Sequence, residues 1–157
     1  EVWHNLKFKN TGSIPWSTGP AMTVQEGSIL GQDTLYFTSS GSEALLRITR
    51  AMDVVADQKE AEVSRQRDTP TPYSGHWDLV TVTGELLVAN RKGEKVDLII
   101  KKLLSGELGT CSPQPAVETL AEGLKKVNPQ KRLTWEVPVE ARGKIRITYT
   151  YKVLVSR

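Results

Sequence analysis

The stretch that decides the fold is Lys144-Ile-Arg-Ile-Thr-Tyr-Thr-Tyr-Lys-Val-Leu-Val155, near the end of the chain. Apolar or aromatic side chains alternate in it with lysine, arginine and threonine, and this period of two is typical of a β-strand with one buried face. Residues 133–139 repeat the alternation, and residues 140–143 form a short link that contains a glycine. The two segments therefore predict a β-hairpin, which needs further strands and a second layer to cover its apolar face.

Similar short patterns recur along the whole chain between glycine, proline and serine turn signals. Residues 44–67 fit either a helix, from the spacing of Leu45, Ile48 and Met52, or two short strands. Residues 105–115 are expected to be a loop, and residues 116–127 a short helix. The other expected strands are 2–10, 21–25, 29–30, 34–38, 76–90 and 96–104.

This succession predicts an all-β fold, an antiparallel β-sandwich over residues 1–157 with at most one short helix. The run Thr69-Pro-Thr-Pro72 is the clearest interruption and suggests a subdivision into 1–72 and 73–157. Leu6 to Asn10 resembles Leu86 to Asn90, since each segment ends in asparagine before a turn. Either a duplication or two independent uses of asparagine in a turn explains this match.

Composition restricts the class of protein further. The chain has 157 residues, 38% apolar and 25% charged, with one cysteine, so it can form no internal disulfide. No apolar run reaches the ~20 residues that a membrane-spanning helix needs. The net charge of +3 is scattered over turns and outward strand positions, which favours solvated strand faces over nucleic-acid binding. Because the chain starts without methionine in strand-like sequence, we expect it to be the C-terminal fragment of a longer protein.

A family resemblance rests on several segments spread over nearly the whole chain. They are Phe8 to Gly12, Pro15 to Pro20, Leu86 to Asn90, Asn128-Pro129, Leu133 to Val137 and Tyr149 to Val153. Together they resemble the C-terminal domain of mucoidy-inhibitor-A-like proteins, a bacterial family of unknown function. The resemblance implies strands at residues 44–67, an upstream domain as the nearest partner, and a periplasmic or cell-envelope location. The order of strands in the second half also resembles immunoglobulin-like modules.

Catalytic and metal-binding patterns are weak in this sequence. Cys111 with His76 is the one thiol and base pairing, and no positive group lies near Cys111 in sequence to activate it. His4 and His76 lack the spaced partners of a metal site. Glu136 and Glu140 are better explained as solvent-facing charge than as a glycosidase pair. We therefore expect neither an enzyme nor a cofactor or metal site.

Two kinds of surface residue remain as candidates for binding. Arg91, Lys92 and Lys95 lie in one turn and form a candidate surface for the upstream domain or another protein, together with the 105–115 loop. Trp3, Trp16 and Trp77, if exposed, could stack on sugar rings, whereas the phase of Trp135 places it in the core. The preferred function is a non-catalytic structural or protein-interaction module of a larger bacterial envelope-associated protein. The alternative is a carbohydrate-binding module that uses the exposed tryptophans.

Overall fold

The computed structural model describes all residues except 121–122, 124–125 and 157, and within this part the chain forms strands and no helix. It divides into two compact units, residues 1–53 (unit 1) and 54–157 (unit 2). The strands are β1 Trp3–Lys9, β2 Gly19–Gln25, β3 Ser28–Leu35, β4 Glu43–Arg50, β5 Val54–Gln66, β6 Trp77–Asn90, β7 Val96–Ser105, β8 Glu107–Ser112, β9 Ala116–Leu120, β10 Gln130–Val139 and β11 Lys144–Ser156. The all-β, antiparallel fold expected from the sequence is confirmed.

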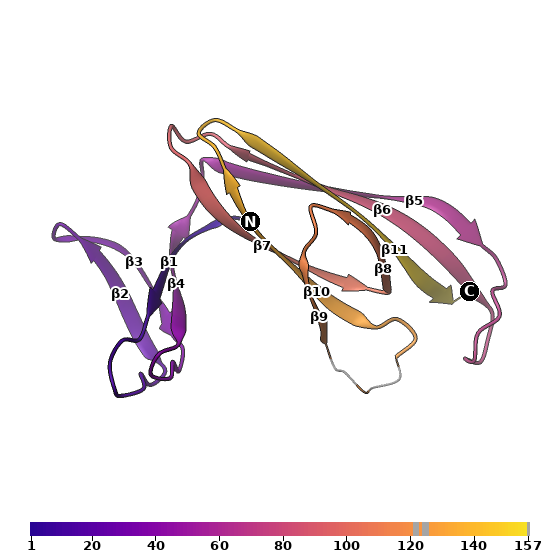
Figure 1. The fold of residues 1–157 in the computed structure, drawn as a ribbon, viewed down its shortest axis with the longest axis horizontal. Helices are drawn as coiled ribbons and strands as arrows, with labels where there is room; N and C mark the ends of the chain where they lie inside the picture. The colour runs from indigo at the N-terminus through magenta and orange to yellow at the C-terminus, as the bar shows by residue number, and fades with distance from the viewer. Residues whose placement is uncertain (121–122, 124–125, 157) are drawn as a thin grey trace. The chain divides into compact units, whose positions relative to one another are not determined.

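Unit 2 contains two antiparallel sheets, in the strand orders β5-β6-β11-β8 and β7-β10-β9 (Figure 1). The core cluster takes residues from both sheets: Leu104, Cys111, Leu133, Trp135, Ile147 and Tyr149. Trp135 is 2% exposed and its indole N–H donates to the backbone oxygen of Pro113 at 2.9 Å. Its expected place in the core is therefore confirmed, and the architecture is consistent with a β-sandwich.

The hairpin expected from residues 133–139 and 144–155 is wrong, because β10 and β11 lie in different sheets. β10 pairs with β7 and β9, whereas β11 pairs with β6 and β8. Leu133 on β10 and Ile147 on β11 are both fully buried in the same core cluster. Residues 140–143 thus cross from one sheet to the other. Two strands that each have an apolar inner face can pack face to face in different sheets as well as pair edge to edge in one sheet.

Two further expectations in this region are wrong. Residues 107–112 form strand β8 where a loop was expected, and residues 116–120 form strand β9 where a helix was expected. Val117 of β9 pairs with Leu133 of β10, so tertiary pairing overrides the weak helical spacing. The rest of the expected helix includes positions 121–122 and 124–125, which lie outside the described residues. In contrast, the choice of strands for residues 44–67 is confirmed by β4 and β5.

The proline-rich run at residues 69–72 lies inside unit 2. It belongs to the loop that joins β5 to β6, and these two strands pair along almost their whole length. The backbone N–H of Thr69 donates to the oxygen of Trp77 at 2.8 Å, which closes this loop. The compact units therefore separate between residues 53 and 54, so residues 54–72 lie with the second unit and not with the first.

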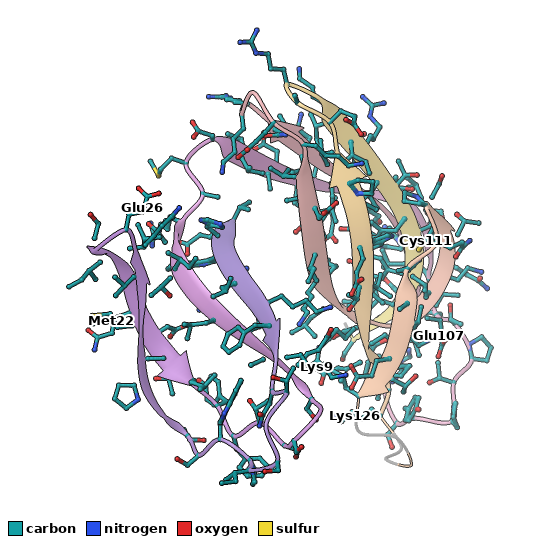
Figure 2. The ribbon with its side chains drawn as sticks, turned by 60° about the vertical axis from the view of Figure 1, so that its left-hand side comes forward. Lys9, Met22, Glu26, Glu107, Cys111 and Lys126 are labelled. Carbon is teal, nitrogen blue, oxygen red and sulfur yellow. The ribbon has the colours of Figure 1, made fainter. Side chains whose placement is uncertain are left out.

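Unit 1 contains two separate two-stranded sheets, β1-β4 and β2-β3. Ala44 and Leu46 of β4 are buried, at 7% and 4% exposure. Many of its large apolar side chains remain exposed, and Figure 2 labels one of them, Met22, on the β2–β3 hairpin. The exposed set in unit 1 is Leu6, Ile14, Met22, Val24, Ile29, Leu30, Tyr36, Phe37, Leu45 and Met52. Unit 1 therefore leaves many of its large apolar side chains in contact with solvent.

Asn90 closes the turn between β6 and β7 and ties it to the link between β10 and β11. Its side chain bonds four backbone groups, donating to the oxygens of Glu94 (2.8 Å), Glu140 (3.0 Å) and Val139 (3.3 Å) and accepting from the N–H of Lys92 (3.0 Å). Asn90 is only 1% exposed. These bonds satisfy a buried amide that would be costly without partners. We call this arrangement the Asn90 clasp.

Asn10 makes an equivalent turn in unit 1, the Asn10 clasp. It is 0% exposed. Its side chain donates to the oxygens of Ile14 (3.0 Å) and Thr38 (3.2 Å) and accepts from the N–H of Gly12 (3.0 Å). The sequence match between Leu6–Asn10 and Leu86–Asn90 therefore has a geometric counterpart.

The strand pairing beside the two clasps has the same register. The backbone N–H of Asn10 donates to Ser42 and that of Asn90 to Gly143, each at 2.9 Å. The equivalent pairs along the strands are Phe8 with Ala44 and Val88 with Ile145, then Leu6 with Leu46 and Leu86 with Ile147. By this correspondence β1 is equivalent to β6, and β4 is equivalent to β11.

Candidate interaction surface

A hollow of about 420 Å³ lies in unit 2 where β5, β6 and β11 meet the Asn90 turn. Its floor is made by small or apolar side chains that point away from the core, and its rim carries charged groups. It is lined by Val55, Asp57, Leu87, Ala89, Asn90, Arg91, Arg142, Gly143 and Lys144. We call it the basic hollow, because three of its side chains are cationic and only Asp57 is anionic.

The Asn90 clasp positions these three cations. Arg91 follows Asn90 directly, Arg142 lies in the link that the clasp holds, and Lys144 begins β11. Arg142 has a positive φ of 56°, and its N–H donates to the oxygen of Lys92 at 3.0 Å. Its backbone is therefore fixed in a conformation that turns the link sharply. Two segments about 50 residues apart in sequence are thus joined at one rigid corner.

These three cations differ from the neighbouring lysines in whether they form ion pairs. In the part of the chain that the structure describes, Arg91, Arg142 and Lys144 form no ion pair, and all three are exposed. In contrast, the Lys92 ammonium lies 3.8 Å from Glu94, and the Lys95 ammonium lies 3.3 Å from Glu140. Of the cations expected at this surface, only Arg91 lines the hollow.

Arg142 and Lys144 were missed by reasoning from the sequence. The sequence alone places Arg142 in a hairpin link and Lys144 at an outward strand position. A signal was present, because two lysines or arginines flank the glycine in Arg142-Gly143-Lys144. Only the crossing of residues 140–143 between the sheets brings this triplet to the turn that carries Arg91.

The three tryptophans proposed for sugar stacking are each half-buried. Trp3 is covered by the guanidinium groups of Arg47 and Arg50, at 5.3 and 5.7 Å from its ring. Trp77 packs edge-on against Tyr73 and donates to the oxygen of Ser74. These two rings therefore already have partners on the faces or edges that a sugar would use.

Trp16 is the tryptophan with an accessible hollow beside it. A depression of about 390 Å³ in unit 1 is lined by Phe8, Pro15, Trp16, Ser17 and Leu35. The rings of Phe8 and Trp16 are tilted by 37° with centroids 5.6 Å apart. Among the three tryptophans, Trp16 therefore lies beside the open aromatic surface that carbohydrate binding requires.

A polar cluster at the edge of the core joins β5, β7 and β11. The Tyr149 hydroxyl donates to the Glu60 carboxylate at 2.6 Å, and the Lys102 ammonium lies 3.0 Å from the same oxygen. Gln58 donates to the Tyr149 hydroxyl at 3.3 Å. Every member is bonded, so the cluster has the properties of a structural network that fixes β5 against the core.

The pKa values of this cluster follow from its geometry. Partial burial raises the pKa of the Glu60 carboxyl, but hydrogen bonds from Tyr149 and Lys102 outweigh burial and hold the pKa below its usual value. Burial, followed by the hydrogen bond to Glu60, raises the pKa of Tyr149 well above its usual value. Glu60 therefore stays ionised and Tyr149 stays protonated near neutral pH.

The remaining catalytic candidates are not brought together. Cys111 is a core residue with 8% exposure, and burial raises the pKa of its thiol (Figure 2). His76 lies at the end of the β5–β6 loop, 82% exposed and 3.3 Å from Asp68. A reactive cysteine needs a lowered pKa and a nearby base, and this site has neither feature. Glu136 is exposed on β10, and Glu140 pairs with Lys95 in the link to β11.

Within the described residues, no group of three or more metal-binding side chains gathers, and no helix is long and apolar enough to cross a membrane. His4 lies on β1 and is exposed. The chain matches no protein-family model, no curated protein and no solved structure.

Proposed function

We propose that this chain is a non-catalytic β-sandwich module that binds an acidic segment of a protein at the basic hollow. The observation that carries the proposal is the set of three cations, Arg91, Arg142 and Lys144, that surround an apolar floor and form no ion pair with any residue that the structure describes. Unpaired cations on a rigid corner attract carboxylates without first breaking an ion pair. The floor formed by Leu87 and Ala89 suits an apolar side chain between those carboxylates.

The identity of the partner is part of the same proposal. The resemblance to mucoidy-inhibitor-A-like proteins supports an upstream domain of the same longer protein, or another envelope protein, as the source of the acidic segment. The order of strands along the second half of the chain supports an immunoglobulin-like description of unit 2. A recognition surface at the loop end of a rigid sandwich is a common arrangement in such modules.

The test uses a fluorescent peptide with the sequence Glu-Glu-Leu-Glu-Glu and the intact chain. The variant Arg91→Glu with Lys144→Glu should weaken binding by at least about tenfold at low salt, because it reverses two cations of the hollow. Lys92→Glu with Lys95→Glu is the matched control, since it changes the net charge equally but alters cations that already have partners. Arg142 is left unchanged because its positive φ complicates substitution.

The control should bind the peptide within about threefold of the unmodified chain. Binding should also weaken as salt is raised, since exposed charges are screened. Equal losses in the two variants would show that net charge, and not the hollow, attracts the peptide. Absence of binding at millimolar peptide in low salt would reject the proposal.

The open aromatic depression beside Trp16 supports a second candidate function, carbohydrate binding. Trp16→Ala removes its largest ring and should abolish any glycan binding, whereas Trp77→Ala should not, because Trp77 packs on Tyr73 and does not line that depression. A glycan array with both variants measures this directly. Glycan binding that survives Trp16→Ala would exclude the depression as the site.

A further inference from the structure

Strand β7 lies at one end of the sheet β7-β10-β9, and its outer edge has no partner strand in the part of the chain that the structure describes (Figure 1). All ten of its residues pair with β10, without a register shift. The bond from the N–H of Gly106 to the oxygen of Pro129, at 2.8 Å, continues this register by one residue. It therefore shows which backbone groups of β7 bond to β10.

Backbone N–H and C=O groups alternate in direction along an antiparallel strand. Since Gly106 bonds toward β10, the even-numbered residues of β7 also bond toward β10. The odd-numbered residues then point their N–H and C=O groups away from β10, toward the open edge. In the middle of the strand these residues are Asp97, Ile99, Lys101 and Leu103.

The other three edge strands of unit 2 carry features that discourage pairing with a further strand. β5 has a register shift between Glu62 and Ser64 and carries charged side chains at Asp57 and Lys59. β8 and β9 are short, with six and five residues. Short length, irregular register and charge are the usual means by which proteins keep sheet edges from joining. β7 is long and regular, so it is the edge of unit 2 best suited to accept another strand.

The side chains along this edge define the kind of strand that fits it. Ile99 and Leu103 are 43% and 64% exposed, although both are large and apolar. Lys101 lies between them, is exposed, and forms no ion pair with a residue that the structure describes. Side chains directly opposite each other on neighbouring strands interact. The pattern therefore favours a partner with apolar residues opposite Ile99 and Leu103 and a carboxylate opposite Lys101.

The space beside β7 is bounded by strand β5 of the other sheet. The Lys102 ammonium of β7 lies 3.0 Å from the Glu60 carboxylate of β5. Ala56 pairs with the buried Val88, so Ala56, Gln58 and Glu60 lie on the core-facing side of β5. Ala56 and Gln58 are nevertheless exposed. β5 thus extends the core-facing surface past β7, to a place that no described strand of the sheet β7-β10-β9 covers.

We propose that the open edge of β7 binds an extended segment of another polypeptide, which adds antiparallel to β7 and covers the core-facing side of β5. In β-strand addition, main-chain hydrogen bonds supply affinity and alternate side chains supply specificity. The segment carries a glutamate opposite Lys101, between β-branched apolar residues opposite Ile99 and Leu103. Its other side chains are small and polar, because they face Ala56 and Gln58.

The test uses the peptide Val-Thr-Glu-Thr-Val-Thr-Lys, labelled and with blocked ends, added to the intact chain. Its valines, glutamate and lysine are spaced to lie opposite Leu103, Lys101, Ile99 and Asp97 in an antiparallel pairing. Lys101→Pro removes one N–H at the open edge and leaves the bonds from β7 to β10 in place. Lys101→Ala is the matched control, because it removes the same side chain and keeps the N–H.

Lys101→Pro should weaken peptide binding by at least about tenfold, whereas Lys101→Ala, which loses one exposed ion pair, should weaken it by no more than about threefold. Equal affinity of the two variants would overturn the proposal. Displacement of the peptide by excess Glu-Glu-Leu-Glu-Glu would also overturn it, since that competitor is designed for the basic hollow. So would a dimer of the chain alone that Lys101→Pro dissociates, because a second copy would then occupy the edge.

An exchange of charge tests the register of the pairing. Lys101→Glu should weaken binding of the glutamate peptide by about fivefold, because two carboxylates then lie opposite each other. The peptide Val-Thr-Lys-Thr-Val-Thr-Lys should bind the Lys101→Glu variant more tightly than the glutamate peptide does. A variant that still prefers the glutamate peptide would contradict the proposed pairing.

Hydrogen exchange on the unmodified chain gives a test that does not depend on the folding of any variant. Saturating peptide should slow the amides of Ile99, Lys101 and Leu103 by at least about tenfold. The amides of Leu98 and Ile100, which bond toward β10, should not change. Unchanged exchange at the first three would rule out strand addition at this edge. The β7 edge and the basic hollow share no residue, so either proposal can fail without the other.

Discussion

The Asn10 and Asn90 clasps share their strand register and their side-chain bonds to the residues two and four positions later, but differ in what surrounds them. The Asn90 clasp lies among seven strands in two sheets with a common core. The Asn10 clasp lies in a unit with two two-stranded sheets, β1-β4 and β2-β3, and many exposed apolar side chains. A fully hydrogen-bonded turn therefore fixes the local backbone, whereas the stability of the unit depends on the sheets that pack around the turn.

The largest expected effect is the loss of the central core residue of unit 2. Trp135→Ala should lower the free energy of unfolding by about 3–5 kcal/mol, because the ring fills space between the two sheets. Trp16→Ala is the contrasting variant. Trp16 is half-buried and belongs to unit 1, so its removal should leave the free energy of unfolding of unit 2 unchanged. Urea unfolding measures both. A loss below about 1 kcal/mol for Trp135→Ala would mean that the core is misassigned.

Replacing each asparagine tests whether each clasp stabilises only its own unit. Asn90→Ala should destabilise unit 2 by about 2–3 kcal/mol, because it leaves several buried backbone groups unpaired. Asn10→Ala removes similar bonds but should leave the unfolding midpoint of unit 2 unchanged. Resolved NMR signals from each unit during urea unfolding provide the measurement. If Asn10→Ala shifted both units equally, the separation into units would be wrong.

Close packing at Gly84 gives a smaller effect. An added Cβ at Gly84 would collide with the ring of Tyr149, which Glu60 holds in place. Gly84→Ala should therefore cost about 1–3 kcal/mol. Gly93→Ala is the matched control, because nothing lies within 4 Å of its added Cβ. The thermal unfolding midpoint should be clearly lower for Gly84→Ala than for Gly93→Ala. Equal midpoints would show that the Tyr149 ring can move away from the added Cβ without cost.

The smallest predicted effect is a dependence on acid. The pKa of Glu60 is lower in the folded chain than its usual value of 4.5, so its ionised form stabilises the fold. That stability is present above pH 4.5 and is lost as pH falls through the lowered pKa. Because Glu60 is partly exposed, the contribution should not exceed about 1 kcal/mol. Glu60→Gln should remove this part of the dependence of stability on pH. An unchanged profile of unfolding free energy against pH would mean that other groups cause the dependence.

Strand positions could be predicted from sequence better than strand partners could. Alternation identified β10 and β11 because it reports which face of a strand is buried. It does not report the neighbouring strand, so a hairpin was expected where the chain crosses between sheets. β9 was missed because its pairing with β10, and not its own sequence pattern, determines its conformation.

The candidate surface was only partly predictable for a related reason. Arg91 could be identified because a turn rich in lysine and arginine is visible in the sequence. Arg142 and Lys144 join it through bonds between distant segments, from the Asn90 side chain to the 139–140 backbone and from the Arg142 N–H to the Lys92 oxygen. The ion pairs that occupy Lys92 and Lys95 also depend on this folded geometry. Contacts between distant segments carry no local signal.

Native-state hydrogen exchange at the two asparagines in the intact chain tests the central claim most directly. Each N–H donates to a backbone oxygen at 2.9 Å, so a difference in exchange reports the surrounding structure and not the bond. If unit 1 is the less supported copy of this corner, the Asn10 amide should exchange at least about tenfold faster than that of Asn90. Exchange at Asn10 as slow as at Asn90 would contradict the claim that the structure around the Asn10 clasp supports it less than unit 2 supports the Asn90 clasp.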